Sequence, residues 1–185
     1  AAHRLERELR AQAAEAERLL RNRAGHRVKW SFTVVQERRP ASVFQEEPEA
    51  DLFVLGRPPS RLGTRHMAGT GPLLVLYDGT DNARRALQPA AALAANGHHE
   101  LLVLLPAADA EAVAALRDEC EEVLGHSKMA VSYLILPPDA PAALDQIARA
   151  HRAALLVVGR DHLLRDETAL QTLLERAPCP VVVAR

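Results

Sequence analysis

The feature that most constrains the fold is a regular alternation of apolar runs and amphipathic stretches from residue 72 to the end of the chain. Unbroken apolar runs are typical of parallel strands that are covered by helices on both faces. Their alternation with helices predicts a three-layer α/β/α sandwich with right-handed crossovers. The expected strands are residues 73–77, 101–105, 130–136, 155–158 and 181–184, and the expected helices are residues 81–96, 109–126, 140–151 and 163–176.

The first 71 residues are interpreted as the rear part of a second copy of the same domain. The sequence LFVLGR at 52–57 matches LLVVGR at 155–160, and an aromatic strand lies upstream of each at the same spacing. A chance match between two helix–strand stretches is the alternative. The expected elements are a helix at 3–24, a strand at 28–35, a short helix at 40–47, a strand at 52–55 and a linker at 57–71. We therefore predict a partial repeat with linker at 1–71 and a complete domain at 72–185.

The composition indicates a globular protein and argues against several kinds of partner. With 23 Lys and Arg against 24 Asp and Glu, the net charge of −1 gives no general attraction for nucleic acid or an anionic membrane. Two cysteines are too few for a disulfide scaffold or a zinc site. No apolar run reaches the roughly 18 residues of a membrane helix, and no signal peptide is recognised. We expect a cytoplasmic protein without direct membrane contact from this segment, although the abrupt start inside a helical pattern leaves room for an upstream anchor.

Both ends of the complete domain resemble those of the universal stress proteins. LVLYDGT at 74–80, followed by NARRAL at 82–87, is similar to the first strand, Asp-Gly-Ser/Thr turn and first helix of that family. ALLVVGR at 154–160 and APCPVVV at 177–183 are similar to its fourth and fifth strands. The resemblance covers 72–185 fully and the preceding segment in part. It implies a five-stranded parallel sheet that is Rossmann-like and of the adenine nucleotide alpha hydrolase-like type.

Some members of this family bind ATP or AMP, so the resemblance implies a candidate adenine-nucleotide site. In such members an Asp after the first strand lies near the adenosine, and a glycine loop after the fourth strand wraps the phosphates. The corresponding residues here are Asp78, Gly79, Thr80 and Gly159. Asp78 also has a structural interpretation, which we favour. Asp-Gly-Thr-Asp is an ordinary strand-to-helix turn, in which Thr80 or Asp81 caps the helix.

The phosphate loop departs from the family pattern of Gly-x-x-Gly, nine residues and Gly-Ser/Thr. Glycines let backbone N–H groups reach phosphate oxygens beside a helix N-terminus. Here His162 takes the second glycine position and Thr172-Leu173 the later pair. In the partial repeat, Pro59 replaces the second glycine, whereas Gly69-Thr70 fits the later pair. Three acidic residues of the complete domain's loop oppose an anion: Asp161, Asp166 and Glu167. We therefore expect no bound cofactor, with ATP or AMP as the alternative.

Enzymatic or metal chemistry has little support in the sequence, and we predict no catalytic residues and no metal site. A phospho-acceptor receiver domain would need an Asp at the end of its third strand and a Lys after its fifth, where Leu136-Pro137-Pro138 and Arg185 stand. No Gly-x-Gly-x-x-Gly dinucleotide motif follows any strand. Cys120 falls on a helix core face and Cys179 leads into a buried strand, so both thiols are expected to be inert. His98-His99 lacks the spaced partners of a metal site.

These observations favour a universal-stress-protein-like regulatory or protective protein that acts by dimerisation or by binding partners. The apolar strand Val181–Val183 would be an exposed edge, which must be paired or covered, so we predict a homodimer through it. Two alternatives stay open: an adenine-nucleotide sensor or slow ATP hydrolase, and the soluble part of a larger membrane-associated protein. The helix at 3–24 is expected to pack on a sheet or a second subunit, since its apolar face has no Trp or Phe to anchor it in a membrane.

Overall fold

The computed structural model describes residues 50–55, 70–125, 129–137, 143–160 and 167–184, together with positions 14, 17, 18, 21 and 22. The chain forms two compact units, Ala1–Arg38 and Arg39–Arg185. In the first unit the described positions are helical, and Arg21 donates a hydrogen bond to Glu17, one turn earlier, at 2.7 Å. These positions agree with the predicted helix at 3–24. The rest of that helix, the strand at 28–35, the helix at 40–47 and most of the linker at 57–71 lie outside the described residues.

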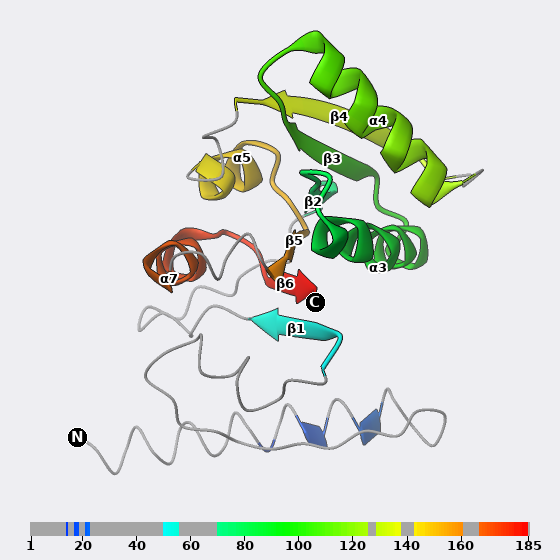
Figure 1. The fold of residues 1–185 in the computed structure, drawn as a ribbon. Coiled ribbons are helices and arrows are strands. Elements are labelled where there is room, and N and C mark those ends of the chain that lie inside the picture. Colours follow the sequence, from blue (N-terminus) through cyan, green and yellow to red (C-terminus); the bar gives the residue numbers. More distant parts are fainter. Residues whose placement is uncertain are drawn as a thin grey trace. The chain divides into compact units, whose positions relative to one another are not determined.

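The second unit is built on a six-stranded sheet with the strand order β1-β6-β5-β2-β3-β4 (Figure 1). The five strands β2 to β6 run parallel to one another, and each strand and helix expected between residues 72 and 185 has its counterpart. The strands are β1 (Leu52–Leu55), β2 (Leu73–Leu76), β3 (Leu101–Pro106), β4 (Val131–Leu136), β5 (Leu155–Gly159) and β6 (Val181–Ala184). The helices are α3 (Asp81–Gly97), α4 (Ala110–Leu124), α5 (Leu144–Ala150) and α7 (Glu167–Arg176).

Helices cover both faces of the sheet, which confirms the predicted three-layer sandwich (Figure 1). Because successive side chains of a strand point to opposite faces, β2 contributes to two separate cores. Leu74 and Leu76 pack with residues of α5 and α7, whereas Leu73 and Val75 pack with residues of α3 and α4. All four of these residues are buried, so the unbroken apolar pattern of β2 reflects burial on both faces.

Helix α3 illustrates how the local sequence sets the layers. Thr80 caps its first turn, and small or apolar residues at spacings of three and four form the face that packs on the sheet. The helix ends at His98, which adopts the left-handed conformation with a φ of 54°. The buried face consists of Ala83, Ala86, Leu87, Ala90 and Ala94. Within the part of the chain that the structure describes, no helix is long and apolar enough to span a membrane.

Strand β1 corrects two details of the sequence-based prediction. It pairs antiparallel with β6, Leu52 opposite Ala184 and Leu55 opposite Val181, so the sheet is mixed and has six strands, where five parallel strands were predicted. The premise that Val181–Val183 forms an exposed edge is therefore wrong, because a strand from the preceding segment covers it. The homodimer itself stays a prediction, as does the division of the chain into a partial repeat at 1–71 and a complete domain at 72–185.

Candidate functional site

The strand order places a candidate ligand site between β2 and β5. From β2 the chain continues through β3 and β4 to one side of the sheet, and it then returns to build β5 and β6 on the other side. The adjacent strands β2 and β5 therefore flank the point where the strand order switches. Open α/β sheets bind ligands at the carboxyl ends of the strands at such a point. Asp78 and Gly159 lie at these two ends, so the structure brings the predicted site residues into one region.

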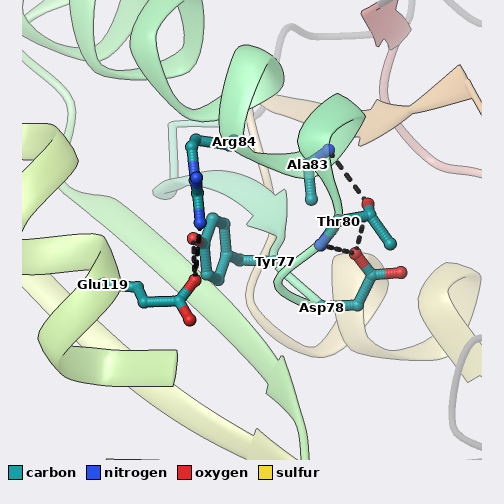
Figure 2. Close-up of polar contacts among 6 residues, drawn as sticks. All are labelled: Tyr77, Asp78, Thr80, Ala83, Arg84 and Glu119. Atoms are coloured by element: carbon teal, nitrogen blue, oxygen red, sulfur yellow. Dashed lines mark hydrogen bonds and ion pairs between the residues drawn. The ribbon is translucent and has the colours of Figure 1, made fainter. Parts of the chain in front are cut away.

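A short chain of hydrogen bonds connects the turn after β2 to helix α3 (Figure 2). The Asp78 Oδ1 atom accepts hydrogen bonds from the Thr80 backbone N–H at 3.1 Å and from the Thr80 hydroxyl at 2.7 Å. The Thr80 Oγ1 atom in turn accepts a hydrogen bond from the Ala83 backbone N–H at 3.2 Å, which caps the helix. Gly79 between them has a φ of 77°, a conformation that favours glycine. These hydrogen bonds agree with the structural interpretation of Asp78 and Thr80 as a strand-to-helix turn with a helix cap.

Gly159 is explained by the close packing of β5 against the first turn of α3. A Cβ atom at this position would lie 3.0 Å from the Ala83 backbone nitrogen and 3.1 Å from the Asn82 carbonyl carbon. Both atoms belong to the helix backbone, which moves less easily than the end of a flexible side chain. Glycine is therefore favoured here by helix–strand packing, whether or not a phosphate binds nearby.

The remaining positions of the predicted phosphate loop do not form a glycine cradle among the described residues. Thr172 and Leu173, which take the place of the later Gly-Ser/Thr pair, lie within helix α7, and Leu173 is buried in the core. Backbone N–H groups inside a helix are used by the helix itself and are not offered to a ligand. His162 and the acidic turn at 161–166 lie outside the described residues, as do Pro59 and Gly69 of the partial repeat.

A three-residue cluster beside the turn was missed by the sequence analysis. The Tyr77 hydroxyl donates a hydrogen bond to Glu119 Oε2 at 2.9 Å, and the Arg84 guanidinium donates to the same oxygen at 3.1 Å (Figure 2). The cluster joins the end of β2 to α3 and α4. The only signal for it in the sequence is a tyrosine that ends an apolar strand. Its partners are 7 and 42 residues away (84 and 119, counted from 77), so local patterns do not reveal them.

The cluster changes the acid–base properties of its members. Burial raises the pKa of Tyr77 to about 12, and the hydrogen bond that its hydroxyl donates to Glu119 also favours the protonated phenol. The hydrogen bond from the Tyr77 hydroxyl, together with that from Arg84, lowers the pKa of Glu119 below its ordinary value. Arg84 and Glu119 are each about half exposed, and ion pairs of that kind contribute little to stability. The buried Tyr77 is therefore the residue of this cluster that contributes most to the stability of the fold.

Replacing Tyr77 with phenylalanine should reveal this role through a pH-dependent loss of stability. Removing the hydroxyl deletes one hydrogen bond, which is expected to lower the free energy of unfolding by about 0.5–1.5 kcal/mol near neutral pH. Since the folded pKa of about 12 exceeds the ordinary 10.0, the protonated phenol stabilises the native state below pH 10. That contribution is lost as pH rises from 10 toward 12, so wild type and Tyr77→Phe should converge there. Urea unfolding at several pH values checks this, and a constant difference across the range would argue against it.

Both cysteines and both neighbouring histidines have structural surroundings. Cys120 and Cys179 are free and buried, and burial raises the pKa of their thiols to about 12 and about 11 respectively. These environments agree with the predicted inert thiols. His98 forms the C-cap of α3, and the Nδ1 atom of His99 donates a hydrogen bond to the Gly71 carbonyl oxygen at 3.0 Å. Among the residues described by the structure, no group of three or more His, Cys, Asp or Glu side chains is placed to hold a metal ion.

The strand order and the site at its switch point define a doubly wound α/β protein. The structure superposes on a universal stress protein from Archaeoglobus fulgidus DSM 4304 with a TM-score of 0.56, at 21% sequence identity, over 72% of this chain and 49% of that chain. Universal stress protein UspA from Lactobacillus plantarum gives a TM-score of 0.51 at 21% identity, over 64% of this chain and all (100%) of that chain. This chain therefore has the fold of the universal stress proteins, which confirms the predicted resemblance.

This chain was also compared with a third solved structure, with protein-family models and with curated proteins. A universal stress protein in complex with cAMP superposes with a TM-score of 0.46 at 22% identity, over 63% of this chain and 98% of that chain. No protein-family model and no curated protein matches the sequence. The likeness thus rests on the fold and on the motifs at the two ends of the domain.

Proposed function

We propose that this chain is a universal-stress-protein-like regulatory or protective protein that acts by binding a partner, including a second copy of itself, and not by catalysis. The observation that carries this proposal is the use of the switch-point residues within the fold. Asp78 accepts two hydrogen bonds from Thr80, and Gly159 lets β5 approach the backbone of α3. These residues thus have structural roles that need no nucleotide, which favours protein contacts as the function. The proposal includes a cytoplasmic location. The two cysteines are free and buried, and free thiols are typical of proteins in a reducing compartment.

An adenine-nucleotide sensor or slow ATP hydrolase is the second candidate. It is favoured by one observation, that Asp78 and Gly159 lie at the carboxyl ends of the adjacent strands β2 and β5, where sheets of this kind bind ligands. In that case a nucleotide would have to contact the Asp78 carboxylate while Thr80 also holds it. Tight binding of a nucleotide would separate this candidate from the first.

Calorimetry with ATP, ADP and AMP in the presence of Mg²⁺ tests the two candidates. We expect the wild-type chain to show no saturable binding tighter than about 100 μM, because the site offers no glycine cradle among its described residues. The informative variant is Asp78→Ala. A matched control is Asp109→Ala, since Asp109 Oδ1 accepts from the Ala112 backbone N–H at 2.8 Å and caps α4, the helix that follows β3 and not β2 or β5.

The Asp109→Ala variant distinguishes the loss of a ligand contact from the loss of a helix cap. Micromolar binding that disappears in Asp78→Ala and persists in Asp109→Ala would replace the proposed function with the nucleotide sensor. Equal behaviour of all three proteins, with heats at the level of dilution, is the result expected here. Far-UV circular dichroism should show native helix content in both variants, because the loss of one cap typically costs only about 1 kcal/mol.

A further inference from the structure

A cavity of about 580 Å³ lies between helix α3 and β1, the outermost strand of the sheet (Figure 1). This volume is within the range of roughly 300–1,000 Å³ that is usual for small-molecule sites. The lining residues come from three segments that are far apart in the sequence: Asp51 and Leu52 where β1 begins, Arg85, Gln88 and Pro89 of α3, and Ala184 at the end of β6. The pairing of β1 with β6 therefore completes the cavity.

The cavity is separate from the candidate site at the switch point. Its described lining residues include none of Asp78, Gly79, Thr80 and Gly159. The strands that contribute to the cavity are β1 and β6, whereas the switch point lies between β2 and β5. A ligand of this cavity would therefore be of a second kind, and it would not need the contacts of a nucleotide site.

The cavity carries one positive and one negative side chain that the fold itself does not use. Arg85 and Asp51 are both exposed, and within the described part of the chain neither forms a hydrogen bond or an ion pair. The neighbouring Arg84 differs, because it pairs with Glu119 of α4 at 3.1 Å. Successive residues of a helix point about 100° apart, so Arg84 and Arg85 lie on different sides of α3. Arg85 is thus available to an anionic group of a ligand, and Asp51 to a cationic group.

The other lining residues add apolar surface and one amide group. Leu52, Pro89 and Ala184 are apolar, and the Gln88 amide can both donate and accept hydrogen bonds. Leu52 is 41% exposed, although it is a leucine within a strand. Contact with an aliphatic group of a ligand would remove this leucine surface from water, which is favourable. The lining therefore matches a small molecule that has both charges and a short aliphatic part.

We propose that this cavity binds a small zwitterion, namely a free α-amino acid with an aliphatic side chain. The Arg85 guanidinium holds the carboxylate of the ligand, the Asp51 carboxylate holds its ammonium group, and Leu52 contacts its side chain. Because the lining joins β1 to α3, the ligand also ties the outermost strand to the domain, so that the stability of the protein rises with ligand concentration. This inference goes beyond the proposed partner-binding function and does not depend on it.

Calorimetric titration with three probes of one carbon skeleton tests this assignment. L-Leucine carries both charges, isocaproate lacks the ammonium group, and isoamylamine lacks the carboxylate. The full-length wild type is compared with Arg85→Gln and Asp51→Asn, each of which removes one charge from an exposed side chain and should leave the fold intact. Arg117→Gln is the matched control, because Arg117 is an exposed arginine of α4 that pairs with Glu121 and does not line the cavity.

We expect the wild type and Arg117→Gln to bind L-leucine saturably with a Kd of about 1 mM or lower, and to bind each single-charge probe about tenfold more weakly. Arg85→Gln should bind L-leucine about tenfold or more weakly than the wild type does, and its affinity for isoamylamine should be unchanged. Asp51→Asn should lose as much affinity for L-leucine and keep its affinity for isocaproate.

Three results would overturn the assignment. If no probe binds saturably to the wild type, the cavity is not a site for amino acids. If both charge variants bind L-leucine as the wild type does, the ligand lies elsewhere. If Arg85→Gln also loses affinity for isoamylamine, the substitution acts on the shape of the cavity and not on a paired charge. Each of these results leaves the proposed partner-binding function in place, because that function is tested by the nucleotide titrations with Asp78→Ala.

Discussion

Replacing Gly71 with alanine should lower the free energy of unfolding by about 3 kcal/mol or more, the largest loss we expect from the addition of one methyl group. A Cβ atom at this position would lie 2.3 Å from the His151 carbonyl oxygen and 2.5 Å from the Arg152 carbonyl oxygen. These are backbone atoms, so no side-chain rotation relieves the contact. The neighbouring backbone is also held in place, since the Gly71 N–H donates to Arg152 at 3.1 Å and the Ala154 N–H donates to Pro72 at 3.0 Å. The entry into β2 would therefore have to move away from the end of α5.

Urea unfolding followed by far-UV circular dichroism measures this effect. Thr70→Ala is the matched control, because Thr70 is exposed and adjacent in the chain, and its substitution should change stability by less than about 0.5 kcal/mol. A Gly71→Ala protein with the stability of that control would mean that the two carbonyl groups can move apart at little cost. Position 71 would then tolerate alanine, and the close packing of Gly71 against residues 151–152 would not be required for the fold.

Truncating Leu156 to alanine should cost about 2–5 kcal/mol, because it opens a cavity in the middle of the sheet. Leu156 is fully buried on β5, between β2 and β6, and its side chain belongs to the core under α5 and α7. The same unfolding measurement applies. Val54→Ala on the outermost strand β1 is the control, with an expected loss below about 0.5 kcal/mol, since its side chain is mostly exposed. Equal losses in the two variants would contradict the described difference between the central and outer strands.

The sequence contained most of the information about the elements of the domain. Apolar runs such as Leu101–Leu105 predicted buried parallel strands, because burial on both faces leaves no polar position in the pattern. The Asp-Gly-Thr turn predicted the start of α3, because a threonine cap is a local interaction three residues in length. The predicted resemblance to universal stress proteins came from such local motifs at the two ends of the domain, and the observed fold agrees with it.

The candidate site could be located from the sequence but not interpreted from it. The sequence identifies both Asp78 and Gly159 as candidates, since each stands at the end of a predicted strand. Their present roles depend on neighbours that lie far away in the chain. The close approach of Gly159 to Asn82 joins positions 77 residues apart (159 minus 82), and the bond between Tyr77 and Glu119 spans 42. No local pattern carries that information.

The sequence by itself determined the alternation of strands and helices, the two apolar faces of the parallel strands and the Thr80 cap of α3, because these depend on neighbours within a few residues. Only the tertiary structure decided that β1 pairs antiparallel with β6, that Gly71 lies against two backbone carbonyl groups, and that Tyr77 shares Glu119 with Arg84. Each of these depends on which distant segments meet. Which segments meet is set by the packing of whole layers. An apolar strand edge such as that of β6 can pair with any strand that lies beside it.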